Sequence, residues 1–216
     1  MKRIIALSLC LIVISIGLVA CGGDSEIPKG MKRAKEDSKL YTLYVPESWV
    51  EIETNSDAAL VQAKPEGVMG SAKIRPETVN AMVWGVSDKI LTDKNLDAEA
   101  RINKAFESFI EEYKAQLNGA FTEISEFSAE ETVREDDARA YVFTAKHNKI
   151  YYKYYVNVIV ANGYYYVVTF NFPQNNLTLN DDGGFNETET IADAKFSDDE
   201  YLEIMDEIIL NFKTHG

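Results

Sequence analysis

Residues 149–172 read Lys-Ile-Tyr-Tyr-Lys-Tyr-Tyr-Val-Asn-Val-Ile-Val-Ala-Asn-Gly-Tyr-Tyr-Tyr-Val-Val-Thr-Phe-Asn-Phe, a stretch dominated by β-branched and aromatic residues. Asn162-Gly163 in its middle is typical of a two-residue type I′ hairpin turn, in which both central positions need a positive φ. We therefore predict strands at 149–161 and 164–172, with Ile159 facing Tyr166, Val158 facing Val167 and Tyr155 facing Phe170. Both faces of this hairpin carry bulky apolar groups, which predicts a central pair of strands covered from both sides.

Further strands and two helices flank this hairpin. Short apolar runs between turn residues predict strands at 40–45, 49–53, 58–63, 68–74, 79–86, 121–133 and 139–146. A helix is predicted at 95–117, capped by Asn95 or Asp97, because apolar residues recur every three or four positions at Ile102, Phe106, Phe109, Tyr113 and Leu117. A closing helix is predicted after the capping box Ser197 to Glu200, with a buried stripe of Leu202, Met205, Ile208, Ile209 and Phe212.

The order of these elements predicts a single α+β domain, in which an antiparallel β-sheet is flanked by helices. The segment Tyr-Thr-Leu-Tyr-Val-Pro-Glu-Ser-Trp at 41–49 resembles the opening strand and Pro-x-x-Trp turn of the PsbP-like and DcrB-like proteins. The likeness extends over 40–213 and closes on Ile-Leu-Asn-Phe at 209–212, with Asn211 where relatives often have Ser. The resemblance implies a PsbP-like α/β/α sandwich and a family of binding or accessory proteins without a shared enzyme activity.

The start of the chain has the pattern of a bacterial lipoprotein signal. Lys2 and Arg3 precede an apolar run that ends in Leu-Val-Ala-Cys at 18–21, which resembles the lipobox. We predict a signal peptide at 1–20, a lipid anchor on Cys21, a flexible tether at 21–38 and a folded domain at 39–216, held on the outer side of the cytoplasmic membrane. A retained membrane helix and a cleaved signal without lipid are the alternatives.

Cysteine use and charge exclude several classes of function. Cys10 lies in the predicted signal and Cys21 carries the lipid, so the folded domain has no thiol for a disulfide, a nucleophile or a metal site. The formal net charge of the full chain is -13, and loss of 1–20 removes two basic residues and no acidic one, which leaves about -15. Such an acidic protein repels the phosphates of nucleic acid, so no nucleic-acid partner is predicted.

Residues 173–195 are polar, and we predict a long loop there. Within it, Thr178, Asn180, Asp182, Gly183 and Glu189 have the spacing of a calcium-binding loop. The first position is Thr instead of Asp, and the preceding residues end a predicted strand instead of a helix. An ordinary turn-rich loop is therefore expected, and no metal or other cofactor is predicted.

The remaining candidate residues fit ordinary structural roles. His147 and His215 belong to no metal-spaced cluster and are expected to be solvated, and no Gly-x-Ser-x-Gly motif of a serine hydrolase is present. The tyrosines of 151–166 are expected in the core more than on a ligand platform. Adjacent carboxylates are expected on solvated faces, in turns and at helix N-termini, at Glu111-Glu112, Glu130-Glu131, Asp136-Asp137, Asp181-Asp182 and Asp198-Asp199.

The expected function is that of a non-enzymatic, membrane-anchored binding or accessory module for an envelope protein or ligand. It would act through a sheet edge, loop 173–195 or exposed aromatic residues. The alternative is a carboxylate-dependent envelope hydrolase, which predicts two carboxylates with raised pKa in one cleft.

Overall fold

The computed structural model describes residues 27–34, 39–53, 61–67, 78–117, 121–134, 138–147, 150–179, 185–186 and 198–215. Its helices are α2 (Asp88–Leu91), α3 (Ala98–Leu117) and α4 (Asp198–Asn211). Its strands are β1 (Met31–Arg33), β2 (Tyr41–Thr42), β3 (Tyr44–Pro46), β4 (Trp49–Ile52), β5 (Val61–Pro65), β6 (Thr78–Gly85), β7 (Ser128–Glu130), β8 (Ala138–His147), β9 (Ile150–Ala161), β10 (Tyr164–Leu179), β11 (Phe185–Asn186) and β12 (Lys213–Thr214).

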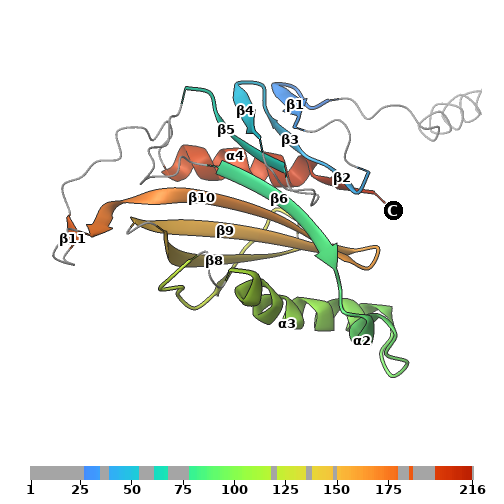
Figure 1. Ribbon diagram of the computed structural model, residues 1–216. Coiled ribbons are helices and arrows are strands. Elements are labelled where there is room, and N and C mark those ends of the chain that lie inside the picture. The colour runs from blue at the N-terminus through green and yellow to red at the C-terminus, as the bar shows by residue number, and fades with distance from the viewer. Residues whose placement is uncertain are drawn as a thin grey trace, which may run out of the picture.

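An eight-stranded sheet forms the centre of the fold, in the order β4-β5-β6-β10-β9-β8-β7, with β11 paired to β10. Neighbouring strands in this sheet are antiparallel. Two-stranded pairs, β1 with β3 and β12 with β2, lie beside it. Figure 1 shows α2 and α3 on one side of the sheet and α4 on the other. The predicted α+β class, an antiparallel sheet flanked by helices, is confirmed.

The predicted hairpin forms the middle of the sheet. Asn162 and Gly163 have φ angles of 53° and 79°, as the type I′ turn requires. The three predicted cross-strand pairs are confirmed, with Ile159 opposite Tyr166, Val158 opposite Val167 and Tyr155 opposite Phe170. Because β6 pairs with the outer side of β10 and β8 with the outer side of β9, both strands of the hairpin are internal.

One face of the sheet packs against α3. The carboxylate of Asp97 accepts a hydrogen bond from the backbone amide of Ala100 at 2.8 Å, so Asp97 caps the helix start. Phe106, Phe109 and Tyr113 are buried as predicted. The prediction for Ile102 is wrong, because this side chain is 42% exposed. Ile102 belongs to the first turns of α3, and Figure 1 shows that this end of the helix lies beside α2.

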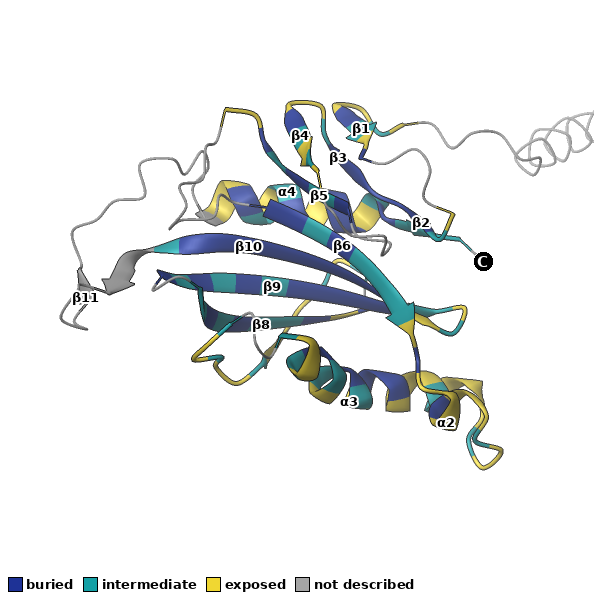
Figure 2. Ribbon diagram, in the orientation of Figure 1, coloured by how far each residue is buried: buried dark blue, intermediate teal, exposed yellow. Residues whose placement is uncertain are grey.

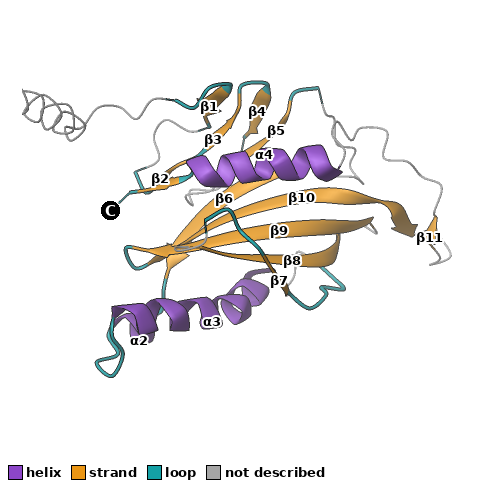
Figure 3. Ribbon diagram, turned by 180° about the vertical axis from the view of Figure 1, so that it is seen from behind, coloured by secondary structure: helices purple, strands orange, loops and turns teal. Residues whose placement is uncertain are grey.

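The other face packs against α4 and the N-terminal strands. The predicted residues Met205, Ile208, Ile209 and Phe212 are buried in this layer, whereas Leu202 is only half-buried. Figure 3 shows α4 lying along the sheet, close to the short strands β1 to β5. Figure 2 shows the central strands β9 and β10 largely buried between the two helical layers. The core is therefore divided into two clusters, one on each face of the sheet.

Part of the predicted tether belongs to the fold. β1 pairs with β3 so that Lys32 lies opposite Val45, and Met31 and Ala34 are buried. The tether prediction is therefore wrong at 31–34, because two apolar side chains and a backbone ladder fix a segment whose composition is mostly charged and polar. The other parts of the tether, 21–26 and 35–38, lie outside the described residues, as does Cys21.

The loop predicted at 173–195 is wrong at its start. β10 continues to Leu179, and its last residues pair with β11. The register of β10 against β9 shifts between Pro173 and Thr178. Proline has no amide donor for the strand ladder, so Pro173 favours an irregularity at this point. For the same reason a proline in the sequence suggests that a strand ends there.

Other differences concern element boundaries. The strand predicted at 121–133 is reduced to β7 and an isolated bridge between Thr122 and Lys146. The short helix α2 was not predicted. The predicted strand at 68–74 and the capping residue Ser197 lie outside the described residues. Across the described ranges, none of the helices combines the length and the apolar character that crossing a membrane would need.

Candidate functional site

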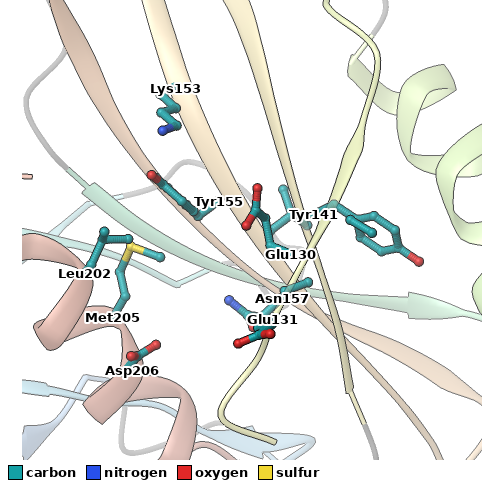
Figure 4. A pocket seen from close by; sticks show the side chains of 12 residues that line it. Glu130, Glu131, Tyr141, Lys153, Tyr155, Asn157, Leu202, Met205 and Asp206 are labelled. Atoms are coloured by element: carbon teal, nitrogen blue, oxygen red, sulfur yellow. The ribbon is translucent and has the colours of Figure 1, made fainter. Parts of the chain in front are cut away.

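A pocket of about 660 Å³ opens on the α4 side of the sheet. Its floor is formed by β8 and β9, one wall by α4 and the opposite edge by β7 with the residue that follows it (Figure 4). A volume of this size suits a small ligand. The residues that carry its chemistry are Glu130, Glu131, Lys153, Tyr155, Asn157 and Asp206, and its apolar lining includes Ala140, Leu202 and Met205.

Strand pairing brings the floor residues to one face. Ala140 of β8 lies opposite Asn157 of β9 on one side and opposite Glu130 of β7 on the other. Directly opposed residues share a face of the sheet, so these side chains point to the same side. Tyr141, the next residue along β8, points to the other face, where its ring stacks on Phe109 of α3 with the centroids 5.8 Å apart.

The wall of the pocket comes from one side of α4. Leu202, Met205 and Asp206 are spaced three and four residues apart, so they lie on neighbouring positions of the helix surface. Met205 is buried, Leu202 is half-buried and Asp206 is exposed. Burial of part of the carboxyl group raises the pKa of Asp206 above its usual value. The carboxyl group of Asp206 therefore lies where a negative charge is disfavoured.

Asn157 is the most deeply buried polar group of the pocket, with 7% of its surface exposed. Its Oδ1 accepts a hydrogen bond from Thr132 Oγ1 at 3.0 Å. Its Nδ2 has no hydrogen-bond partner among the residues that the structure describes. Figure 4 shows this amide facing the space between α4 and β7. A free donor is therefore directed into the pocket.

Lys153 and Tyr155 line the opposite end of the floor. The ammonium of Lys153 lies 5.0 Å from the centroid of the Tyr155 ring, which is a cation–π contact. Tyr155 also stacks on Phe172, with the centroids 5.8 Å apart. The aromatic ring is held firmly, and it lies beside a positive charge.

One of the predicted carboxylate pairs lines this pocket, and the two other described pairs do not. The pair Glu130-Glu131 lines it, whereas Glu111-Glu112 lies on α3 at the other face, where Glu112 accepts a hydrogen bond from the Tyr165 hydroxyl at 3.3 Å. Asp198-Asp199 lies at the start of α4. The pairs at 136–137 and 181–182 lie outside the described residues.

The hairpin tyrosines are mostly core residues, as predicted. Tyr152, Tyr154, Tyr165 and Tyr166 are buried, Tyr151 and Tyr155 are half-buried, and Tyr164 is 38% exposed. Only Tyr155 of this group lines the pocket. Of the hairpin tyrosines, Tyr155 is therefore the one that could contact a ligand in this pocket.

The prediction of a solvated His215 is wrong. Its Nε2 lies 2.8 Å from Thr42 Oγ1, its amide donates to the Leu40 carbonyl at 2.8 Å, and its own carbonyl accepts a hydrogen bond from Tyr166 at 3.1 Å. Pairing of β12 with β2 brings the end of the chain back to the core, which sequence spacing alone does not reveal. His147, predicted in a turn, is the last residue of β8, and its ring lies 5.8 Å from that of Phe121.

The calcium spacing is interrupted by a strand. Thr178 lies in β10 and pairs with Asn186 of β11, so these residues extend a ladder where a calcium loop needs a tight turn. Asn180, Asp182, Gly183 and Glu189 lie outside the described residues. Within the described part of the chain, no group of three or more His, Cys, Asp or Glu side chains is placed to hold a metal ion.

Sequence reasoning missed the residues that define the pocket. Asn157 is a single polar residue in an apolar strand, and only the alternation of Tyr155, Asn157 and Ile159 on one face marks its position. Asp206 follows the buried Met205 on the last helix, and its proximity to β7 depends on how α4 crosses the sheet. No local pattern encodes that arrangement.

The chain is similar to the solution structure of cyanobacterial PsbP (CyanoP) from Synechocystis sp. PCC 6803, with 12% identity over 92% of this chain and 99% of that chain and a TM-score of 0.41. It is also similar to a protein from Bacteroides thetaiotaomicron VPI-5482, with 9% identity and a TM-score of 0.41. That match covers 82% of this chain and 46% of the other protein. No protein-family model matches the sequence, and no curated protein matches it.

Proposed function

We propose that this protein is a membrane-anchored lipoprotein on the outer side of a bacterial cytoplasmic membrane, and that its domain binds an envelope component without enzymatic chemistry. The pocket between α4 and β7–β9 carries this proposal. It combines a size suited to a small ligand with polar groups that the fold leaves unused, above all the Nδ2 of Asn157.

The anchor rests on the residues before the fold. Cys21 follows an apolar run that begins after Lys2 and Arg3, and the described chain starts at Ile27. Even when fully extended, the few residues between them span at most about 20 Å. The domain would therefore stay close to the membrane, with Lys29, Lys32 and Arg33 near the lipid headgroups. Basic side chains in that position add to membrane attraction.

Mass spectrometry of the mature protein tests the anchor. The expected N-terminus is an acylated Cys21, and Cys21→Ser should release the protein from the membrane fraction. A mature chain that begins elsewhere, or that carries no acyl group, would contradict the location.

Native mass spectrometry tests the binding function. The full-length protein in a non-ionic detergent is incubated with an extract of the envelope, and a bound molecule of small mass is expected. Ala140→Leu should prevent that binding, because the larger side chain extends from the floor into the pocket. Gly85→Ala is the control, since a Cβ at Gly85 meets nothing within 4 Å. Absence of any ligand, or binding that Ala140→Leu does not affect, would count against the proposal.

A second candidate function is that of a carboxylate-dependent hydrolase. Three carboxylates line the pocket, and burial raises the pKa of one of them, Asp206, as a general acid requires. The hydrolase hypothesis predicts two carboxylates with raised pKa in one cleft, and the raised pKa of Asp206 supports it for one of them. Release of soluble fragments from labelled envelope polymers by the parent protein, and its loss in Asp206→Asn, would favour the enzyme over the binding module.

A further inference from the structure

The described lining of the pocket is acidic, and no described residue neutralises it with an ion pair. Glu130 and Glu131 approach from β7 and Asp206 approaches from α4, so carboxylates reach the space from two sides (Figure 4). None of these three groups forms an ion pair with a described residue. The lining cation, Lys153, lies over the Tyr155 ring and not against a carboxylate.

The net charge of the whole chain strengthens this local charge. A formal charge of -13 gives the surface a negative potential, and a partly enclosed pocket concentrates it. Partial burial disfavours the ionised form of Asp206, and a bound cation would reverse that effect. A positively charged occupant is therefore the best electrostatic complement.

Asn157 supplies an independent reason to expect a ligand. The side chain of Asn157 is 7% exposed and its Oδ1 is already bonded to Thr132, whereas its Nδ2 opens on the pocket, where an acceptor oxygen can replace solvent. The Nδ2 group faces the pocket and donates to no described residue. An acceptor oxygen on the occupant would complete its hydrogen bonding.

The geometry favours an organic cation over a metal ion. Within the described ranges the carboxylates are not close enough together to form a metal site. Leu202 and Met205 instead line the wall next to Asp206 with apolar surface. A long aliphatic stem that ends in an ammonium can pack along such a wall while its charge reaches the carboxylates.

Given the binding function proposed above, we infer that the pocket binds a ligand with an ammonium group on an aliphatic stem and a nearby acceptor oxygen, as in a lysine side chain of a short peptide. The ammonium lies between Glu131 and Asp206. Asn157 Nδ2 donates to a carbonyl oxygen of the ligand, and the methylene groups pack on Leu202 and Met205.

Titration calorimetry of the full-length protein in a non-ionic detergent tests this inference with three matched probes. N-acetyl-lysine methylamide carries the ammonium, N-acetyl-norleucine methylamide has a similar aliphatic stem without the charge, and N-acetyl-glutamate methylamide carries a negative charge. The lysine derivative is expected to bind at least about tenfold more tightly than the norleucine derivative, since a hydrogen bond to a charged group is worth about 1.5–3 kcal/mol. The glutamate derivative is expected not to bind.

Three variants locate the interaction. Asp206→Asn and Glu131→Gln are each expected to weaken binding of the lysine derivative by about tenfold. Glu203→Gln is the control, because it removes the same formal charge from α4 at an exposed position outside the lining. Since the overall field changes equally in Asp206→Asn and Glu203→Gln, only a local contact separates them.

Each outcome decides a different point. Equal affinity for the lysine and norleucine derivatives, or no binding of either, overturns the ammonium assignment. Equal weakening in Asp206→Asn and Glu203→Gln overturns its location. If the lysine derivative fails while Ala140→Leu still blocks an envelope ligand, the ligand class is wrong and the binding function stands. If both tests fail, the binding function falls as well.

Discussion

The hydroxyl of Tyr201 on α4 donates a hydrogen bond of 2.8 Å to the backbone carbonyl of Thr78 on β6. The Tyr201 ring is buried and stacks on Trp49, with the centroids 6.2 Å apart. These contacts hold the start of α4 over the β6 side of the sheet. The β8–β9 side of the same face is left open, and this opening is the pocket.

Loss of the Tyr201 hydroxyl should weaken the attachment of α4. Tyr201→Phe keeps the ring stacking but removes a buried hydrogen bond, so we expect a loss of about 1 kcal/mol in the free energy of unfolding. Urea denaturation measures it. Tyr164→Phe is the control, because Tyr164 is 38% exposed and should leave stability unchanged. Equal midpoints for both variants would show that the hydrogen bond contributes nothing net.

The hairpin turn should be sensitive to a side chain at Gly163. Its φ of 79° disfavours residues with a Cβ, and the nearest atom to a new Cβ, Leu91 Cδ1, would lie at an ordinary 3.5 Å. Gly163→Ala is therefore expected to destabilise the protein by about 1–2 kcal/mol through backbone strain and not through a clash. Gly85→Ala has open space around it and no positive φ, so its urea midpoint should remain close to that of the parent.

The parts of the fold that local patterns encode were predictable from the sequence. Asn162-Gly163 fixes the turn, and the turn fixes the register of Tyr155 against Phe170. The spacing of Phe106, Phe109 and Tyr113 likewise identifies the buried side of α3. In each case a few residues that are close in the sequence are enough to predict the structure.

The remaining features depend on contacts between distant segments. Met31 is buried only because β1 pairs with β3, and His215 is held only because β12 returns to β2. The pocket likewise depends on the packing of segments that are distant in the sequence. Glu130 and Asp206 lie far apart in the sequence and come to line the same pocket because α4 crosses the sheet. The sequence identified Glu130-Glu131 as a carboxylate pair, but no neighbouring residues indicated that α4 would lie across the pocket from it.

Alkaline pH should destabilise the α3 face through Tyr113. Burial raises the pKa of this hydroxyl from 10.0 to about 12, although its hydrogen bond with Thr169 opposes the shift. The folded state therefore keeps a proton that the unfolded state loses between these values, and stability falls as pH rises from 10 to 12. In Tyr113→Phe the midpoint of urea unfolding should fall less over this range. An unchanged slope would mean that other groups account for the alkaline loss.

Acid pH should reveal the position of Asp206. Because burial raises its pKa in the folded state above the value of 3.8, the folded state binds the proton more readily than the unfolded state. The stability that this provides is complete below the unfolded pKa and is lost as pH rises through the folded pKa. Asp206→Asn, which is neutral at every pH, should therefore be more stable than the parent at neutral pH, and the difference should shrink as pH falls.

Urea unfolding of the parent and Asp206→Asn at a series of pH values measures this difference. Glu203→Gln is the matched control, because it removes one negative charge from the same helix at an exposed position outside the pocket lining. Addition of N-acetyl-lysine methylamide at neutral pH should stabilise the parent more than Asp206→Asn, because only the parent offers a carboxylate to the ammonium. If both variants follow the same pH curve, the effect comes from the general repulsion along α4 and not from the place of Asp206 in the pocket.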